Sequence, residues 1–304
     1  MILDPRLQSL QASFAPCPIT RINDHFLDKW GIELWIKRDD LLHSIISGNK
    51  WRKLKYILNH ALIKGSSCML SMGGAYSNHL HALAFAGQCL NLKTAAYIRG
   101  ERPTVFNPTL TDLCHWGMDL RFISRSEYRQ LRQFKAFDSL PDLKTGEYWL
   151  PEGGAINLAL QGVAESIAEI TIPYDVLAVA CGTGTTLAGM IAAAPTHCQI
   201  LGIAALQAGY MHSDVQQLLT TQHIIRNNWH INLDYHCGGF AKTHPELLAF
   251  MQNFEALHAI PLDPVYTGKL LFGIYDLIKQ GYFTAGQRVM LIHTGGLQGK
   301  RKFC

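Results

Sequence analysis

From residue 32 onward, the apolar positions of the chain follow two alternating spacings. Short apolar runs at 32–37, 68–72 and 93–98 have the length of buried strands. At 51–62 and 78–90 the apolar residues recur every three or four positions, as in amphipathic helices. The pattern continues with strands predicted at 119–123, 175–180, 199–204 and 288–293, and helices predicted at 109–116, 126–137, 155–170, 187–194, 244–258 and 269–280. Such alternation predicts an α/β protein with mostly parallel sheets.

Three stretches lack a clear period. Residues 1–31 carry scattered turn signals, residues 140–154 are rich in loop formers, and residues 205–243 are weakly patterned. We interpret 140–154 as a boundary between two α/β layers. Because ligands of open parallel sheets bind beyond the carboxyl ends of the strands, we expect a site in the crevice between these layers.

The composition narrows the class of protein. The chain has 304 residues, of which 48% are hydrophobic and 16% charged, as in an ordinary soluble globular protein. The net charge of +4 is spread without a basic block, which argues against a nucleic-acid partner. We find no leader and no apolar run long enough to span a membrane. The eight cysteines form no CxxC pair, so we expect reduced, mostly buried thiols in a cytoplasmic protein.

One predicted helix start breaks a rule of helix design. Gly48 and Asn49 favour a turn and a helix cap. Lys50, Arg52 and Lys53 then crowd the first turn, where the helix dipole favours negative charge. A bound anion would remove this conflict, and a lysine amine can also form an imine. The alternative is a solvated basic helix start.

A second polar turn follows the predicted strand at 68–72. Two glycines lead into a helix that begins at Ser77 or Asn78. A hydroxyl and an amide at this edge of a sheet can face a ligand, although we expect at least one of them to be an ordinary helix cap. The nearby His79 and His81 lack metal-ligand spacing, so we assign no metal site.

A third turn, residues 181–186, joins a predicted strand to an alanine-rich helix. Its glycines and threonines can cradle a phosphate with backbone N–H groups and hydroxyls. No Gly-Lys-Ser/Thr follows, which excludes a Walker loop, and Leu187 stands where a dinucleotide motif needs a third glycine. A phosphomonoester therefore fits better than NAD or ATP. The alternative is a tight strand–helix turn without a ligand.

Two C-terminal motifs also place polar residues beside glycines, at Tyr266–Lys269 and His293–Gly296. Together, the motifs from Lys37 to Gly296 resemble those of fold-type II pyridoxal 5'-phosphate (PLP) enzymes. They are most similar to the 1-aminocyclopropane-1-carboxylate deaminase / D-cysteine desulfhydrase family, whose motifs occur in the same order.

The resemblance implies a fold and partners. It implies a two-domain α/β protein like the tryptophan synthase β subunit, with mostly parallel sheets. The larger, cofactor-binding domain would comprise residues 1–44 and 155–304, and the smaller α/β domain residues 45–154. It also implies PLP as cofactor, a small amino acid as substrate, and a homodimer.

The resemblance further assigns roles to single residues. Lys50 is similar to the lysine that forms an imine with PLP and later moves the Cα proton of the substrate. Ser77 resembles the hydroxyl that engages the substrate carboxylate or assists proton transfer, and Tyr266 resembles a tyrosine over the substrate. Asn78 is similar to the amide that bonds the phenolic oxygen of the cofactor. The other expected cofactor-binding residues are Lys53, Cys181, Gly182, Thr183, Gly184, Thr185, Thr186, Thr267, Thr294 and Gly295; Lys53 and residues 183–186 should hold the phosphate.

The resemblance also bears on the pyridine nitrogen. The ring-opening deaminases carry a glutamate where this chain has Thr267, and Thr294 matches the desulfhydrases. A threonine can bond the nitrogen but cannot keep it protonated, which weakens the ring as an electron sink. We therefore expect Thr294, with Thr267 as the alternative, to bond the nitrogen, and no carboxylate to lie equally near. Phe240 stands where family members often carry a second tyrosine.

The predicted activity is β-elimination from a small amino acid, as in D-cysteine desulfhydrase, giving pyruvate, ammonia and sulfide. One alternative keeps PLP but opens the ring of 1-aminocyclopropane-1-carboxylate or deaminates another amino acid. An alternative of another class is a catalytically degenerate PLP-binding protein. The last alternative is a nucleotide-binding α/β domain that forms no imine.

Overall fold

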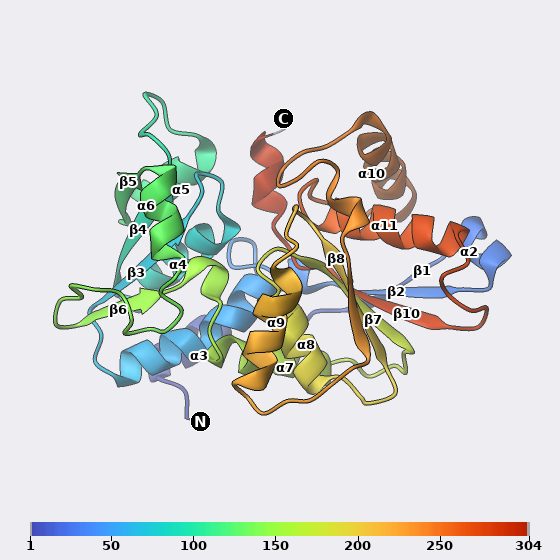
Figure 1. Ribbon diagram of the computed structural model, residues 1–304, viewed down its shortest axis with the longest axis horizontal. Helices are drawn as coiled ribbons and strands as arrows, with labels where there is room; N and C mark the ends of the chain where they lie inside the picture. Colours follow the sequence, from blue (N-terminus) through green and yellow to red (C-terminus); the bar gives the residue numbers. More distant parts are fainter. Residues whose placement is uncertain (1, 303–304) are drawn as a thin grey trace.

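The computed structural model describes residues 2–302, which form two separate sheets (Figure 1). The larger has the order β1–β2–β10–β7–β8–β9, with β1 (Ile19–Ile22), β2 (Glu33–Lys37), β7 (Val176–Cys181), β8 (Gln199–Ala204), β9 (Trp229–Asn232) and β10 (Arg288–Ile292). The smaller has the order β5–β4–β3–β6, with β3 (Cys68–Gly73), β4 (Lys93–Arg99), β5 (Asp119–Ile123) and β6 (Glu147–Leu150). Apart from the antiparallel edge pair β1–β2, the strands pair in parallel. The predicted α/β class with mostly parallel sheets is confirmed.

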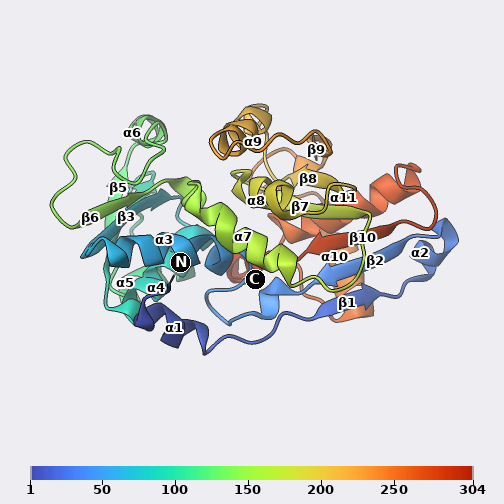
Figure 2. The same ribbon diagram turned by 90° about the horizontal axis from the view of Figure 1, so that it is seen from below.

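Helices cover both faces of the larger sheet (Figure 2). One face carries α2 (His25–Trp30), α10 (Pro245–His258) and α11 (Thr267–Lys279), and the other carries α7 (Leu158–Ala168), α8 (Thr185–Ala193) and α9 (Met211–Thr220). Alternate residues of strand β7 pack against the helices on the two opposite faces of the sheet. Ala178 packs with α10 and α11, whereas its neighbours Leu177 and Val179 pack with α7 and α8. Because successive strand side chains point to opposite faces, a continuous apolar run is needed here.

The smaller sheet is likewise covered on both faces. Helix α6 (Arg125–Leu131) packs on one face, and α3 (Asn49–Ile63), α4 (Asn78–Leu90) and α5 (Pro108–His115) pack on the other. The N-terminal helix α1 (Pro5–Gln11) joins the second group, because Leu7 and Leu10 lie in the same apolar cluster as α3 and α4. The predicted domain boundaries at 44/45 and 154/155 stay a prediction.

Several short elements differ from the sequence expectation. Strand β6 lies inside the stretch predicted as loop at 140–154, and residues 1–31 contain α1, β1 and α2. Helix α9 and strand β9 lie in the weakly patterned stretch, and α6 ends at Leu131 instead of at residue 137. The apolar run Tyr148–Leu150 is too short for its period to be recognised, and tertiary burial stabilises it as a strand.

Helix α3 crosses α7 where the two layers meet (Figure 2). A Cβ atom on Gly162 of α7 would fall 1.8 Å from the carbonyl oxygen of Arg52, so glycine is required at this crossing. On α8, a Cβ on Gly189 would fall 2.6 Å from Val163 of α7. The three helices therefore pack closely against one another, which holds the start of α3 against the larger sheet.

Within residues 2–302, no helix has both the length and the apolar character needed to cross a bilayer. The seven cysteines in this range are free. Only Cys181 and Cys198 are buried, and Cys89 and Cys114 are exposed, so the expectation of mostly buried thiols is wrong. The two exposed cysteines lie near the ends of α4 and α5. The residues of these helices that face the core are at other positions, so the two thiols point to solvent.

Candidate active site

A cavity of about 430 Å³ opens between the two sheets, at the carboxyl ends of β3, β7 and β10. The three predicted turns at 48–53, 73–78 and 181–186 and the two C-terminal motifs contribute to its wall, although they lie far apart in the sequence. The predicted site residues that line it are Lys50, Lys53, Ser77, Asn78, Cys181, Gly182, Thr183, Gly184, Thr186, Tyr266, Thr294 and Gly295. Thr185 and Thr267 are buried behind this wall and do not line the cavity.

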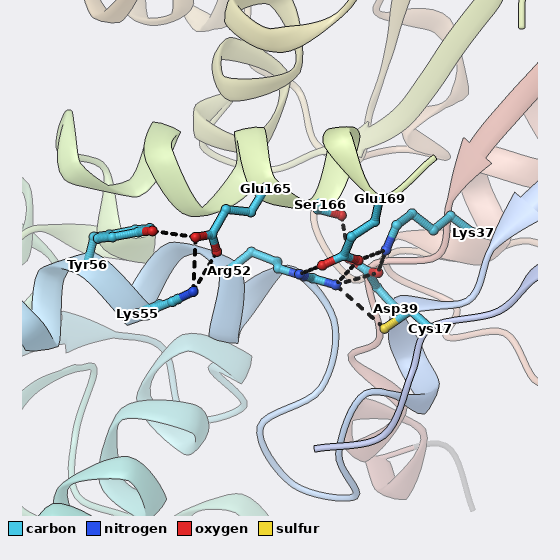
Figure 3. A network of polar contacts seen from close by, with 9 residues as sticks. All are labelled: Cys17, Lys37, Asp39, Arg52, Lys55, Tyr56, Glu165, Ser166 and Glu169. Atoms are coloured by element: carbon cyan, nitrogen blue, oxygen red, sulfur yellow. Dashed lines mark hydrogen bonds and ion pairs between the residues drawn. The ribbon is translucent and has the colours of Figure 1, made fainter. Parts of the chain in front are cut away.

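An ion-pair network, buried except at Glu169, joins α3 to the end of α7 and to the end of β2 (Figure 3). Arg52 donates to Glu169 (2.7 Å) and to Asp39 (3.3 Å), and Lys37 bonds to the same two carboxylates. Burial opposes the ionisation of Asp39, but the two cations still lower its pKa. Cys17, Asp39 and Glu169 are close enough together for a metal ion, yet both carboxylates already bind cations. Burial also raises the pKa of the Cys17 thiol to about 12. The network therefore anchors α3.

Two other lysines of α3 face the cavity without such partners. Lys53 donates to the carbonyl of Gly153 (3.1 Å) and to Thr183 Oγ1 (3.4 Å), whereas Lys50 donates no hydrogen bond to any described residue. Burial lowers the pKa of Lys53 well below its ordinary value. Burial also lowers the pKa of Lys50 to about 8, although Asp263 opposes the shift. Neither amine bonds to a carboxylate and burial disfavours the charge of both, so an anion beside them would stabilise their charged forms.

The loop after β7 offers the matching half of an anion site. Gly184 takes a left-handed conformation (φ 73°) at the start of α8. Thr183 Oγ1 lies 3.0 Å from Thr185 Oγ1, and the Asn49 amide donates to Thr186 Oγ1 (3.0 Å). A phosphate at this helix start would meet backbone N–H groups and hydroxyls on one side and the Lys53 amine on the other. The residues present therefore fit the phosphate of PLP.

Ser77 and Asn78 stand side by side at the start of α4. Ser77 Oγ accepts a hydrogen bond from the N–H of Leu80 (3.2 Å), which confirms that one of the two is a helix cap. A Cβ atom on Gly73 would fall 2.7 Å from Ser77 Oγ, so the preceding glycine gives the hydroxyl its room. The oxygen of the Asn78 side chain accepts a hydrogen bond from Gln298. Both side chains line the cavity.

Asp263 organises the turn before α11. Its carboxylate accepts from the N–H groups of Val265 (2.9 Å), Tyr266 (2.8 Å) and Thr267 (2.9 Å). It also accepts from the hydroxyl of Thr267 (2.7 Å), which is thereby committed to the turn. Thr294 lines the cavity and is the better candidate for the pyridine nitrogen. Asp263 is not among the residues that the sequence predicts, although an aspartate just before a helix is a known start signal.

Tyr266 closes one side of the cavity. A Cβ atom on Gly182 would fall 3.1 Å from its ring, so the phosphate loop and the tyrosine are in close contact. The Phe240 ring lies edge-on to the Tyr266 ring with centroids 6.2 Å apart. Burial raises the pKa of the Tyr266 hydroxyl, which therefore stays protonated at neutral pH.

A further group of lining residues is absent from the sequence prediction. Glu152 accepts from Tyr128 (2.6 Å) and pairs with Arg132 (2.9 Å), and Arg132 also reaches the hydroxyl of Tyr210 (3.4 Å). These contacts join α6 to the residue that precedes α9. No local motif marks them, because Glu152 and Tyr210 lie far in the sequence from Tyr128 and Arg132 at the end of α6.

The family model described as pyridoxal-phosphate dependent enzyme matches residues 12–295. The chain belongs to the pyridoxal-phosphate dependent enzyme family. A relative from Arabidopsis thaliana, named bifunctional D-cysteine desulfhydrase/1-aminocyclopropane-1-carboxylate deaminase, is 32% identical over 310 residues, covering 93% of this chain and 77% of the relative. A D-cysteine desulfhydrase from Klebsiella pneumoniae is 26% identical over 318 residues, covering 96% and 94%. The crystal structure of an ACC deaminase homologue matches with a TM-score of 0.79 and 27% identity, covering 98% and 97%.

These similarities confirm the predicted family, fold and cofactor, and the enzyme class of a PLP-dependent lyase or deaminase. The roles of the individual site residues stay predictions. Their placement around one cavity, with two lysines that bond no carboxylate facing a phosphate loop, is compatible with PLP bound between α3 and α8.

Proposed function

We propose that the protein catalyses β-elimination from a small amino acid, most directly D-cysteine, with release of pyruvate, ammonia and sulfide. The observation that carries this proposal is that every described carboxylate lining the cavity already accepts hydrogen bonds or ion pairs from other groups of the protein. Among the described lining residues these are Glu152 and Asp263, and both are already engaged by other groups. Thr294 is thus the neutral partner left for the pyridine nitrogen.

A neutral partner favours elimination over reactions that store carbanion charge in the ring. In the proposed reaction the Cα–H bond breaks, its electron pair forms a Cα=Cβ bond, and the Cβ–S pair leaves with hydrosulfide. Water then hydrolyses the amino-acrylate product to pyruvate and ammonia. No oxidant or reductant is needed.

When bound, PLP supplies an aldehyde that takes up the substrate amine and a conjugated ring that withdraws electrons from Cα. The chain supplies the remaining functions. Lys50, whose pKa is lowered to about 8, is partly neutral near physiological pH and can accept the Cα proton and pass it to the leaving hydrosulfide. The Ser77 hydroxyl orients the substrate carboxylate, and the protonated Tyr266 donates a hydrogen bond above the substrate.

Opening of the ring of 1-aminocyclopropane-1-carboxylate is the second candidate activity. The bifunctional name of the Arabidopsis thaliana relative supports it. The choice between the two depends on the partner of the pyridine nitrogen, because ring opening benefits more from a protonated ring.

A substrate screen of the PLP-loaded protein tests the proposal. D-cysteine, L-cysteine, D-serine and 1-aminocyclopropane-1-carboxylate are offered separately, and keto acid, ammonia and sulfide are measured. We expect the highest kcat/KM with D-cysteine, with pyruvate and sulfide formed in equal amounts. Faster turnover of 1-aminocyclopropane-1-carboxylate would contradict the proposed chemistry, and no turnover of any amino acid would favour a degenerate PLP-binding protein.

The assembly, location and domain division belong to the same proposal. A homodimer is supported by the family resemblance, and light scattering should give twice the 34.0 kDa of the chain. A cytoplasmic location is supported by the seven free cysteines, and cell fractionation tests it. The division into residues 45–154 and the rest is supported by the two separate sheets. Limited proteolysis that cuts first within the interior of either sheet would contradict it.

A further inference from the structure

The C-terminal segment hydrogen-bonds to the side chain of Asn78. After β10 the chain forms a short 3₁₀-helix (Leu297–Lys302), in which Gln298 donates to the side-chain oxygen of Asn78. The oxygen of Gln298 accepts from the hydroxyl of Thr109 (2.9 Å) and from Arg301 (3.1 Å). Thr109 is buried at the start of α5, so this chain of bonds links both layers of the protein at the cavity wall.

The Arg301 guanidinium determines which side-chain atoms of Gln298 and Asn78 donate and which accept. A guanidinium can only donate, so the atom of Gln298 that faces Arg301 must be the amide oxygen. The Gln298 nitrogen then faces Asn78 and can only donate, which requires the Asn78 oxygen at that contact.

The Asn78 nitrogen is therefore turned away from Gln298. It lies beside Gly296, where a Cβ atom would fall only 2.7 Å from it, and both residues line the cavity. No acceptor among the described residues bonds this nitrogen, so its hydrogens remain available to a ligand.

We propose that Gln298 is a positioning residue that fixes the Asn78 amide with its nitrogen toward the phenolic oxygen of PLP. The inference rests on the proposed place of PLP beside Lys50 and Asn78. A donated hydrogen bond stabilises the phenolate and lowers the pKa of the bound cofactor, whereas an amide oxygen in the same place would raise it. The orientation that Gln298 imposes thus sets the protonation state of the cofactor.

The test is the substitution Gln298→Glu. The introduced carboxylate can still accept from Thr109 and Arg301, but it cannot donate to Asn78. The Asn78 amide should then rotate to donate its nitrogen to this carboxylate and present its oxygen to the cavity. We expect the near-visible absorbance of the loaded protein to titrate at a pH higher by about one unit or more. We also expect kcat to fall about tenfold, with little change in KM.

The matched control is Lys300→Gln on the same short helix. Lys300 pairs with Glu255 and does not touch Asn78, so this variant should titrate like the parent protein. Gln298→Met provides a second variant, because it removes the hydrogen bonds without adding charge and should give a smaller upward shift. Cofactor-free melting temperatures show whether each variant is folded.

An unchanged absorbance titration in folded Gln298→Glu or Gln298→Met protein would overturn the inference, as would an equal shift in Lys300→Gln. A separate measurement, the near-visible absorbance of Lys50→Ala protein, tests whether PLP is bound beside Lys50 and Asn78. If Lys50→Ala protein keeps the near-visible absorbance, PLP is bound elsewhere. If Lys50→Ala loses it while the Gln298 variants titrate like the parent, only the role of Gln298 is wrong.

Discussion

The backbone of Gly48 lies directly against the carbonyl group of Thr294. A Cβ atom on Gly48 would fall 1.9 Å from that oxygen, and the neighbouring Asn49 N–H donates to it (3.3 Å). The turn after β10 therefore holds the first residue of α3, directly before the proposed catalytic lysine. Residues from opposite ends of the sequence set the geometry of one helix start.

Gly48→Ala should disturb both stability and cofactor binding. The alanine meets the Thr294 carbonyl and must also adopt a positive φ, since Gly48 has φ 60° and ψ −143°. We expect a loss of about 2 kcal/mol or more in the free energy of unfolding, measured in urea, together with weaker PLP loading. Gly65→Ala is the control, because Gly65 has φ 71° but nothing within 4 Å of the added Cβ. Equal losses in both variants would show that the Thr294 contact is unimportant.

Replacing Lys50 tests the proposed imine. Lys50→Ala should abolish the near-visible absorbance that borohydride removes, and with it the activity, while the fold persists. Lys55→Ala is the control on the same helix, since Lys55 pairs with Glu165 (2.8 Å) away from the cavity. Absorbance, activity and far-ultraviolet circular dichroism are measured in parallel. Activity retained by Lys50→Ala would show that another residue carries this role.

Lys53→Met should have opposite effects with and without PLP. In the cofactor-free protein it removes a buried amine that has no carboxylate partner and whose charged form burial disfavours, so the melting temperature should rise or stay level. In the loaded protein it removes a charge-assisted hydrogen bond to phosphate, and affinity for PLP should fall about 10- to 100-fold. Thermal melts and a PLP titration measure the two effects. A clear loss of stability in the cofactor-free protein would mean that Lys53 is mainly structural.

Asp39→Asn should change the pH dependence of stability. The folded pKa of Asp39 lies below its ordinary value of 3.8, so its contribution is complete above that pH and is lost as the pH falls below it. At pH 7 the free energy of unfolding of the variant should be about 3 kcal/mol lower than that of the parent protein, because Arg52 and Lys37 lose a buried partner. This difference between variant and parent should become smaller in acid.

Asp119→Asn is the control for this experiment. Asp119 forms an exposed pair with Arg121, and its loss should cost no more than about 1 kcal/mol at any pH. Urea unfolding at pH 7 and at successively lower pH values below 3.8 measures both variants where the contribution of Asp39 is complete and where it is lost. A gap between Asp39→Asn and the parent protein that stays constant with pH would contradict the assigned ionisation.

Periodicity predicts the longer and more strongly patterned elements well. Helix α4 (Asn78–Leu90) and strands β5 (Asp119–Ile123) and β8 (Gln199–Ala204) have the predicted bounds. Strand β6 escapes prediction because it is short, and its pairing partner β3 lies far away in the sequence. Short segments carry too little local signal, so long-range burial decides their conformation.

The sequence by itself determined the chemistry that each turn can offer. The glycines, caps and basic side chains of residues 48–53, 73–78 and 182–186 act within a few positions of one another, so a local pattern is enough to recognise them. Only the tertiary structure decided which charges are compensated. Arg52 finds Glu169 across 117 positions, while Lys53, one residue further along α3, faces the cavity without a carboxylate. Burial and distant neighbours set the pKa of each group, and neither is encoded in the local sequence.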